Sequence, residues 1–530
     1  MVFTLASFAA VTALVALFSY LKTKGQDETS QEGYFLGGRS LSGIIIFGSL
    51  MMTNLSAEQL VGRNGQGYAV GMTAMGWETM VPIALTLMAI FFAPRYFKLG
   101  ITTIPEFLED RFDHMTRIIV SAIFLIAYIV TMLPLVLYAG SVAMERIFNV
   151  TDLVGNRFMA ITIMCVALGV IGGIYAIFGG LAAVATSDSL NGVIFIIGAV
   201  ILIPILAFVA LGDGSLAEGI RTFLTASPEH LNAIRPWNAQ APEIPWPVIV
   251  VGCGINHLSY WCTNQSIIQR VLGAKSLKEA QKGTLLTGLV CVFCPLFLVA
   301  PGIVQFIRDG GVLTDFDMAY PTLVKDLLPA PLLGFFSAVM FGAILSSFNS
   351  VLNSSMTLFT LDILPTISKK ERSAADNIKI AKRFGIVLCL LSIIIAPFLV
   401  YLPSGISTFL NQMWGYYGVP VLAIVIMGMV NPYVPDFAPK VTIVFHIVCY
   451  GLMMQLIPLH FLYFEVAAFV LDLILMAVLA KVKPRSTAYV LQDNAPVDMT
   501  PWKYRKPVIA LSFVLLAVIY VIFSPLGVGA

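Results

Sequence analysis

The sequence is poor in charge. Asp, Glu, Lys and Arg make up 11% of its 530 residues, whereas a soluble domain carries about 25%. The formal net charge is only +2, so the chain lacks the basic surplus that nucleic-acid-binding proteins use against phosphate. Hydrophobic residues reach 58%. This composition excludes an ordinary soluble domain and a nucleic-acid binder, and it predicts a protein embedded in membrane lipid.

Cysteine is also scarce, with seven residues in the chain. All seven lie inside apolar runs, so we expect neither a disulfide framework nor a cysteine-based metal site. The sequence has no HExxH motif, no pair of catalytic aspartates and no repeat typical of a carbonyl-lined ion filter. The Gly-rich stretch GQGYAVG at 65–71 follows no predicted strand, which argues against a nucleotide loop. We therefore expect neither an enzyme nor a channel, and no cofactor.

Long apolar runs are abundant. About 14 of them are long enough to cross a hydrocarbon core of ~30 Å as a helix. They predict an all-α polytopic membrane protein. The predicted spans cover 2–21, 41–62, 74–98, 118–145, 158–179, 184–211, 246–268, 284–307, 332–362, 384–402, 405–430, 441–459, 461–480 and 507–525.

The basic residues between these runs are unevenly distributed. If the N-terminus lies outside, the inside loops hold roughly three quarters of the Lys and Arg residues, as cytoplasmic loops do. An even number of spans then places the C-terminus outside as well. The first run lacks a basic leader, which favours a retained helix over a cleaved signal peptide. We expect an integral protein of a bacterial inner (plasma) membrane.

Two connecting segments are long enough to have a structure of their own. The outside loop at 212–245 is rich in Pro, Asn and Gly, which favours an ordered cap or a short interfacial helix. The segment at 481–506 is predicted to be a cytoplasmic linker before the last helix.

One predicted span carries an unexpected polar cluster. An unwound stretch there would expose backbone carbonyls to a small hard cation and side chains to a polar solute. The alternative is that these side chains only pair with neighbouring helices. The sequence SLMMTNLSAEQLVG, at 49–62, holds five polar residues within seven positions: Thr53, Asn54, Ser56, Glu58 and Gln59.

The pattern recurs five spans later in VGCGINHLSYWCTNQSIIQR, at 251–270. Because five is odd, the two helices enter the membrane from opposite sides. Interrupted helices at corresponding places of two inverted halves indicate the midplane binding site of a transporter. We predict inverted repeats over 41–211 and 246–430, one extra helix in 1–22 and three accessory helices in 441–530.

Two further sites inside apolar runs are candidates for transport chemistry. Glu78 could accept hydrogen bonds from the hydroxyls of a polyol, or lie at the membrane interface. The adjacent pair Ser346 and Ser347 suits Na⁺, because two neutral hydroxyls and a few carbonyls bury no net negative charge. The alternative for the serines is packing between helices.

Three more acidic residues lie in predicted spans. Asp188 lies near the inner end of its span, where it could attract cations on their way to the cytoplasm or cap a helix. Glu465 and Asp472 lie seven residues apart on one helix face, outside both repeats, and we interpret them as structural.

Seven motifs resemble those of the sodium:solute symporter family, and within it those of the bacterial sodium/sugar branch. The resemblance covers nearly the whole chain. It implies a LeuT-like core of two inverted five-helix repeats, and uptake of one organic solute with Na⁺ by alternating access. The motifs are GYFLGGRSL at 33–41, TNLSAEQLVG at 53–62, GITTIPEFLEDRF at 100–112, YAIFGGLAAV at 175–184, YWCTNQSIIQR at 260–270, AKSLKEAQKG at 274–283 and SSFNSVLNSS at 346–355.

The resemblance also implies roles for single residues, carried over by position. Asp188 matches the acidic residue on the ion route to the cytoplasm, Tyr260 matches the inner aromatic gate, and Asn54 matches the residue that bonds to that gate. The implied sodium ligands are the backbone carbonyls of Met52, Leu55 and Ala343 and the hydroxyls of Ser346 and Ser347. The implied substrate-binding residues are Gln59, Glu78, His257, Asn264, Cys291 and Gln412.

Three positions depart from the galactose-type pattern of that branch. His257 replaces an asparagine, Cys291 a lysine and Val81 a serine, which changes the hydrogen bonds offered to a sugar. The prediction is therefore Na⁺-coupled symport of a sugar, a polyol or another small polar solute. The alternative is a non-sugar solute such as sialic acid, a carboxylate or an amino acid. For an anionic solute, a protonated His257 is the only cation expected in the chamber.

Overall fold

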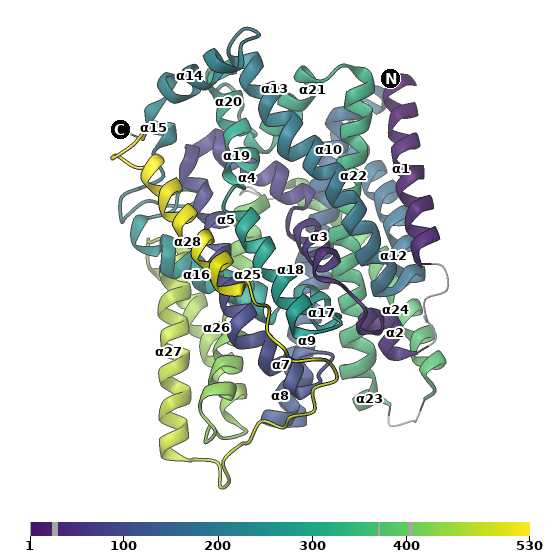
Figure 1. Ribbon diagram of the computed structural model, residues 1–530, viewed down its shortest axis with the longest axis vertical. Helices are drawn as coiled ribbons and strands as arrows, with labels where there is room; N and C mark the ends of the chain where they lie inside the picture. The colour runs from purple at the N-terminus through teal and green to yellow at the C-terminus, as the bar shows by residue number, and fades with distance from the viewer. Residues whose placement is uncertain (1, 24–29, 369–371, 402–405, 530) are drawn as a thin grey trace.

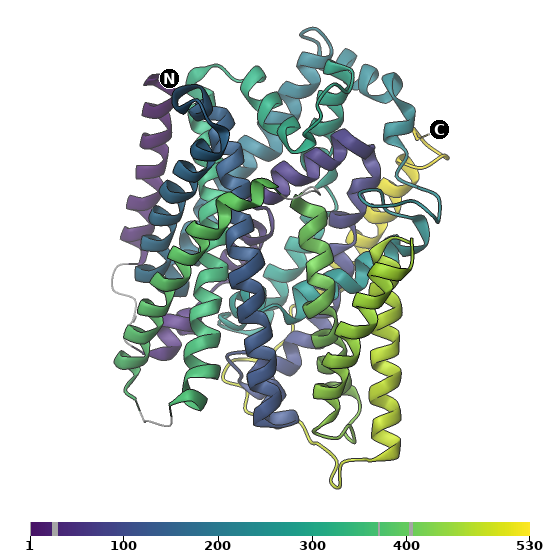
Figure 2. The ribbon, with the colours of Figure 1, turned by 180° about the vertical axis from the view of Figure 1, so that it is seen from behind.

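The computed structural model describes residues 2–23, 30–368, 372–401 and 406–529, and they form a bundle of helices with no β-strand element in these ranges (Figures 1 and 2). The predicted all-α class is confirmed. Lys24, Lys369 and Lys370, which belong to predicted inside loops, lie outside the described residues.

The helices cover the predicted spans but do not match them one to one. The first half of the chain forms α1 (Val2–Thr23), α3 (Gly43–Asn54), α4 (Ala57–Val70), α5 (Gly76–Thr79), α6 (Val81–Leu87), α7 (Ala93–Leu99), α8 (Ile104–Arg111), α9 (His114–Ala127), α10 (Leu133–Phe148), α12 (Arg157–Phe195), α13 (Ile203–Leu211), α14 (Leu216–Ala226) and α15 (Pro228–Leu231). The second half forms α16 (Trp246–Thr263), α17 (Gln265–Leu272), α18 (Leu277–Cys291), α19 (Pro295–Leu298), α20 (Ala300–Asp309), α21 (Ala319–Leu327), α22 (Ala330–Thr357), η7 (Leu358–Ile363), α23 (Leu364–Ile367), α24 (Ala374–Ile395), α25 (Ile406–Val430), α26 (Ala438–Leu456), α27 (Phe461–Val482) and α28 (Arg505–Ile522).

The expected count of 14 spans is not confirmed. Within the described residues, 10 helices are long and apolar enough to cross a membrane, or 11 if the bent pair Leu277–Cys291 and Pro295–Asp309 is one span. The difference arises where an apolar run is not one straight helix. The run predicted at 41–62, for example, is divided between α3 and α4.

Two helices are interrupted where the sequence predicted it. The first ends at Asn54, and Leu55 leaves helical geometry with φ −80° and ψ 64°. Ser56 then begins α4 as its N-cap, accepting a hydrogen bond from the Gln59 amide, as serine does at helix starts. In the second, α16 ends at Thr263 and the Asn264 side chain caps α17 by accepting from the Ser266 amide.

The interrupted helices lie in the interior of the bundle. The first, α3, packs between α12 and α18, while α22 packs against both α12 and α1. Buried apolar residues form one large continuous core through these helices. This arrangement brings the two helix breaks and the serine-rich part of α22 to the same region of the molecule.

The connecting segments also take the predicted form. The loop at 212–245 contains α14 and α15, which confirms the expected short helices. The linker at 481–506 runs along the end of the bundle away from the termini (Figure 1) and bonds to it through Asn494 N–H and the Lys98 carbonyl. The N- and C-termini lie towards the same end of the molecule (Figure 1).

Candidate functional site

The break between α3 and α4 frees two backbone carbonyls. In a continuous helix, the amides of Ser56 and Gln59 would bond to the carbonyls of Met52 and Leu55. Here the Ser56 amide donates to the Asn54 carbonyl at 2.9 Å, and the Gln59 amide donates to the Ser56 hydroxyl. The carbonyls of Met52 and Leu55 thereby lose their helical partners in a buried place, where unpaired carbonyls are costly unless a ligand replaces them.

The serines of α22 face this break. Ser347 donates its hydroxyl hydrogen to the Thr53 carbonyl at 3.3 Å, and Ser350 lies 3.2 Å from the Thr53 hydroxyl. The buried Ser346 side chain lies against the Asp188 carboxylate. The structure therefore brings Ser347 beside the opened backbone of α3, whereas Ser346 lies on the side of Asp188.

A buried ion pair lies one turn further along these helices. The Asp188 carboxylate accepts a hydrogen bond from Ser49 at 2.9 Å and lies 3.5 Å from the Arg270 guanidinium. Arg270 also donates to Ser49 at 2.8 Å and to the Ser350 hydroxyl. The Asp188 carboxylate also faces the Ser346 hydroxyl. Four elements, α3, α12, α17 and α22, thus converge on one charged group.

A polar cavity opens beside the break. It is bounded by α4, α16, α22 and α25, and its wall alternates amides, hydroxyls and charged groups with apolar side chains and the Trp414 ring. This mixture suits a small polar ligand that also has apolar faces. The lining residues are Thr53, Asn54, Ser56, Glu58, Gln59, Arg63, Met132, Val136, Asn256, His257, Tyr260, Ser266, Ser347, Val351, Leu410, Asn411 and Trp414.

Arg63 is the charged residue that the sequence analysis missed at this wall. The predicted spans at 41–62 and 74–98 leave Arg63 in a connecting loop, yet its side chain is 2% exposed and lies 3.6 Å from Glu78. Its Nε–H donates to the Gln59 side chain at 2.9 Å. Arg63 and Gln59 are four residues apart and therefore share a helix face, and this spacing was the available signal. His257 is thus not the only cation-forming residue at the cavity.

The predicted substrate-binding residues fall into two groups. Gln59 and His257 line the cavity. Glu78 lies one layer behind the wall, where it accepts a hydrogen bond from Asn54 at 3.1 Å, and Cys291 lies beside Glu78. The remaining two, Asn264 and Gln412, are not among the lining residues.

Asn264 and Gln412 lie at different positions outside the cavity wall. The Asn264 side chain accepts hydrogen bonds from Tyr128 and Ser266, so it stabilises the second helix break. Gln412 is half-buried next to Asn411, which does line the cavity.

The predicted gate residue Tyr260 lies at the cavity wall, half-buried. Its ring packs edge-on against Trp414, with centroids 5.3 Å apart, and the Trp414 indole donates to Ser259 at 2.5 Å. The side chain of Asn54, the predicted partner of the gate, donates to Glu78. An aromatic wall therefore closes one side of the cavity.

The two acidic residues interpreted as structural are both paired. The Asn256 amide, at the cavity wall, donates to Glu465 at 3.2 Å. Asp472 lies 2.6 Å from His446, whose other ring nitrogen is 3.0 Å from the Gly415 carbonyl. Glu465 thus holds a cavity residue in place from the accessory helix α27.

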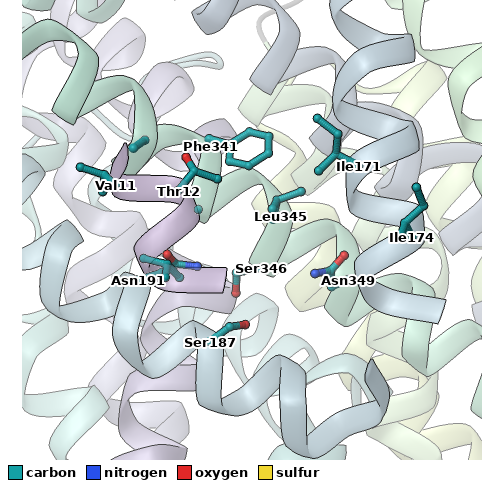
Figure 3. Close-up of a pocket in the computed structure, with 13 residues that line it drawn as sticks. Val11, Thr12, Ile171, Ile174, Ser187, Asn191, Phe341, Leu345, Ser346 and Asn349 are labelled. Atoms are coloured by element: carbon teal, nitrogen blue, oxygen red, sulfur yellow. The ribbon is translucent and has the colours of Figure 1, made fainter. Parts of the chain in front are cut away.

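A second cavity, of about 220 Å³, lies between α1, α12 and α22. Apolar side chains such as Ile171 and Phe341 form most of its wall, and Ser346 and Asn349 form part of its polar side (Figure 3). Such a lining matches a hydrated solute poorly. The cavity at the helix break is therefore the better candidate for a polar cargo.

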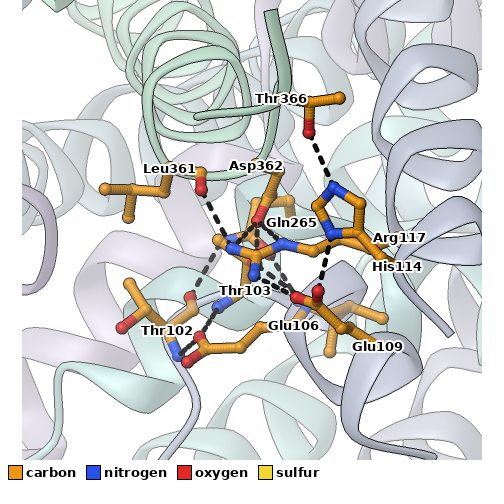
Figure 4. A network of polar contacts seen from close by, with 11 residues as sticks. Thr102, Thr103, Glu106, Glu109, His114, Arg117, Gln265, Leu361, Asp362 and Thr366 are labelled. Carbon is orange, nitrogen blue, oxygen red and sulfur yellow. Dashed lines mark hydrogen bonds and ion pairs between the residues drawn. The ribbon is translucent and has the colours of Figure 1, made fainter. Parts of the chain in front are cut away.

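A polar network joins four elements at the end of the bundle away from the termini (Figure 4). Arg117 donates to Asp362 at 2.7 Å and pairs with Glu109 at 2.5 Å, while His114 lies 2.6 Å from Glu109 and 2.9 Å from Thr366. Burial alone would raise the pKa of Glu109, but the hydrogen bonds from Arg117 and His114 lower it below its ordinary value. Residues from α8, α9, η7 and α23 are tied together here.

Comparisons with known proteins show which family the chain belongs to. The model of the sodium:solute symporter family matches residues 34–436. The chain belongs to the sodium:solute symporter family. This symporter is 41% identical over 529 residues to the uncharacterised symporter YidK of Escherichia coli (strain K12), covering 99% of the chain and 90% of the relative.

Two other relatives bear transport names. The symporter is 30% identical over 443 residues to a sodium/glucose cotransporter of Vibrio parahaemolyticus, covering 80% of the chain and 79% of the relative. It is 28% identical over 455 residues to a human sodium/myo-inositol cotransporter, covering 78% of the chain and 62% of the relative. The chain is therefore a Na⁺-coupled solute symporter of a membrane.

Solved structures agree on the fold. A Na⁺-coupled sialic acid symporter superposes with a TM-score of 0.79 at 22% identity, over 92% of this chain and 99% of that one. Mhp1, a nucleobase-cation-symport-1 family transporter, gives a TM-score of 0.53 at 12% identity, over 90% of this chain and 98% of that one. The symporter has the LeuT-type fold that the resemblance implied.

Proposed function

We propose that this symporter imports a neutral, sugar-like polar solute together with Na⁺ by alternating access. The observation that carries the proposal is the wall of the polar cavity. It offers hydrogen-bonding amides and hydroxyls next to the rings of Tyr260 and Trp414. A sugar or polyol presents the matching combination of hydroxyls and apolar C–H faces.

The charges at the cavity argue for a neutral solute. The positive charge of Arg63 lies against the Glu78 carboxylate at 3.6 Å, and Glu58 lines the same wall. With all three groups ionised their sum is negative, and with one carboxyl protonated it is zero. Only the loss of both carboxylate charges would leave Arg63 available for an anion. A solute carboxylate would therefore meet repulsion or compete with Glu78.

The sodium site of the proposal is the one implied by the family resemblance. Its ligands are the carbonyls of Met52, Leu55 and Ala343 and the hydroxyls of Ser346 and Ser347. Two observations support it: the freed carbonyls at the break and the Ser347 contact with the Thr53 carbonyl. A hard monovalent cation accepts such neutral oxygen ligands.

Asp188 is proposed as the next residue that the ion contacts on its route to the cytoplasm. Its carboxylate lies against the Ser346 side chain, and a carboxylate attracts a cation away from a site made of neutral oxygens. The nearby Arg270 limits this attraction, so that the ion is released and not trapped.

The proposal includes the arrangement of the chain. The repeats 41–211 and 246–430 are supported by the corresponding breaks in α3–α4 and α16–α17, with 1–22 and 441–530 as accessory parts. The excess of basic residues in the predicted inside loops favours both termini outside, in the inner membrane of a bacterium.

Sialic acid is a second candidate solute, because Arg63 lines the cavity and a sialic acid symporter shares the fold. At 22% identity, that likeness concerns the fold alone.

A solute panel in proteoliposomes tests the proposal. Purified full-length protein is reconstituted, and uptake of hexoses, inositols, sialic acid, amino acids and dicarboxylates is measured with an inward Na⁺ gradient and with K⁺ in its place. A sugar or polyol should accumulate only with Na⁺. Accumulation of sialic acid or another anion alone would overturn the choice of solute, and uptake indifferent to Na⁺ would overturn the coupling.

A further inference from the structure

Three side chains that commonly ligate metals meet behind the cavity wall. Glu78 in α5, Cys291 at the end of α18 and Cys294 just after it present one carboxylate oxygen and two sulfurs that lie within 4.8 Å of one another. All three residues are buried. In the part of the chain that the structure describes, this is the one group of three such side chains.

The bend after α18 brings the two cysteines together. The Cys294 amide donates to the Cys291 carbonyl at 3.2 Å, and the helix direction changes by 54° between Leu277–Cys291 and Pro295–Asp309. Residues three apart in a helical turn lie on the same side. The pair has the C-x-x-C spacing of many thiolate metal sites, although the position of both residues inside an apolar run predicted no metal site.

We propose that Glu78, Cys291 and Cys294 form a binding site for Zn²⁺. Two thiolates select a thiophilic ion over the hard cations Na⁺, Mg²⁺ and Ca²⁺, and a carboxylate is an ordinary third ligand of zinc. Three protein ligands leave one tetrahedral position for water. The three ligand atoms lie within 4.8 Å of one another, and they must move closer together to enter a tetrahedral shell with Zn–S bonds of about 2.3 Å.

The charge balance of this site is favourable. Zn²⁺ displaces one proton from each thiol, two Zn–S bonds form, and both protons leave to water, so no oxidant or reductant takes part. One dication replaces two protons, and the net charge of the cluster is unchanged. Arg63 lies 3.6 Å from Glu78, and its positive charge remains next to the anionic metal cluster. The charge of the buried cluster is therefore compensated.

Metal binding has a consequence for the cavity. Asn54, at the cavity wall, donates its hydrogen bond to Glu78, and a metal on that carboxylate weakens this support. The bound metal would also link α5, from the first half of the chain, to the bend after α18 in the second half. We expect Zn²⁺ to inhibit solute uptake.

Cadmium is the probe that tests the site, because Cd²⁺ bound to thiolate has a charge-transfer absorption in the ultraviolet. The purified full-length protein is titrated with Cd²⁺, then with competing Zn²⁺. We expect one thiolate-bound metal per chain. Cys294→Ser and Glu78→Gln should each weaken binding by at least about tenfold, since each removes a ligand. Cys165→Ser is the matched control: it removes another buried thiol and should leave binding unchanged.

A second measurement needs no variant and so does not depend on folding of a mutant. X-ray absorption of the zinc-loaded parent should give two sulfur ligands at about 2.3 Å with oxygen or nitrogen completing the shell. Calorimetry in buffers of different ionisation enthalpy should give two protons released per zinc. A shell without sulfur, retention of the cadmium band in Cys294→Ser, or no binding below millimolar metal would each overturn the site. Proteoliposome uptake measured with a chelator does not depend on this result, so failure here and failure of the proposed transport are distinguishable.

Discussion

Asn411 presents a buried amide to the cavity with no partner for its Nδ2 atom among the described residues. An unpaired buried donor costs about 1–3 kcal/mol, and a bound solute hydroxyl removes that cost. We expect Asn411→Ala to raise the solute concentration for half-maximal uptake by roughly tenfold, since about 1.4 kcal/mol is tenfold in affinity. Half-saturation by Na⁺ should change much less, and proteoliposome uptake measures both.

Gln412, the next residue in the chain, is the comparison for this prediction. The family resemblance implies that Gln412→Ala raises the solute half-saturation, whereas the structure has Asn411 at the cavity wall. We expect the larger effect from Asn411→Ala. A larger effect from Gln412→Ala would contradict this placement of the cargo.

Arg270 is the residue whose loss should most destabilise the interior. Its side chain is 1% exposed and lies 3.5 Å from Asp188, so Arg270→Ala leaves a buried carboxylate without its cation. Breaking such a pair costs about 3–5 kcal/mol. The thermal unfolding midpoint in detergent should fall clearly.

Arg221→Ala is the comparison for this prediction. Arg221 is 75% exposed and 3.7 Å from Glu218, and an exposed pair contributes only about 0–1 kcal/mol. Similar midpoints for Arg270→Ala and Arg221→Ala would show that the buried pair is not stabilising.

Single residues were predictable where the signal is local. Ser346 and Ser347 are neighbours in the sequence, and this adjacency was enough to indicate a hydroxyl pair. Asn411 and Trp414 could not be found this way, because their role depends on how α25 packs against α16. Arg63 was misplaced because a charged residue was assumed to end the span, although burial beside a carboxylate makes an intramembrane arginine tolerable.

The break between α3 and α4 depends on the side chain that caps the start of the second helix. Ser56 begins the second helix by accepting a hydrogen bond from the Gln59 amide, and loss of such a cap costs about 1 kcal/mol. We expect Ser56→Ala to lower stability by about that amount and also to raise the Na⁺ half-saturation, because a changed start of α4 alters the freed carbonyls.

Ser215→Ala separates these two effects. Ser215 caps the exposed α14 in the same way, by accepting from the Glu218 amide. Its loss should cost similar stability and leave Na⁺ dependence unchanged. Equal transport defects in both variants would mean that the break acts only through stability.

Elements were predicted well in kind and less well in number. Both breaks were located because polar residues, a capping side chain and an interrupted apolar run coincide in the sequence. The expected count of 14 spans rested on treating every apolar run as one crossing. The bend after α18 was not predicted, although Pro295 directly follows Cys294 and a proline interrupts or kinks a helix.

The whole molecule has its two termini towards one end (Figure 1). The distribution of basic residues predicts that this end lies outside. We therefore expect an impermeant label to reach tags on both termini in intact, outer-membrane-permeabilised cells. Labelling of a tag only after the inner membrane is opened would reverse the orientation and with it the proposed direction of transport.

The fold of the whole molecule was predictable because the motifs extend through both halves of the chain. Composition alone gave only a helical membrane protein. The place of the cargo cavity was not predictable, since it depends on residues from α4, α16, α22 and α25 that meet only in three dimensions.

Direct binding of radioactive Na⁺ to the purified protein, without solute, tests the central claim that opened backbone and a hydroxyl pair hold the ion. Ser347→Ala should raise the Na⁺ dissociation constant at least about tenfold, the equivalent of about 1.4 kcal/mol. Ser355→Ala should leave it unchanged, because that hydroxyl only bonds to the Val351 carbonyl of its own helix. Equal Na⁺ affinity in the parent and in Ser347→Ala would contradict the proposed site.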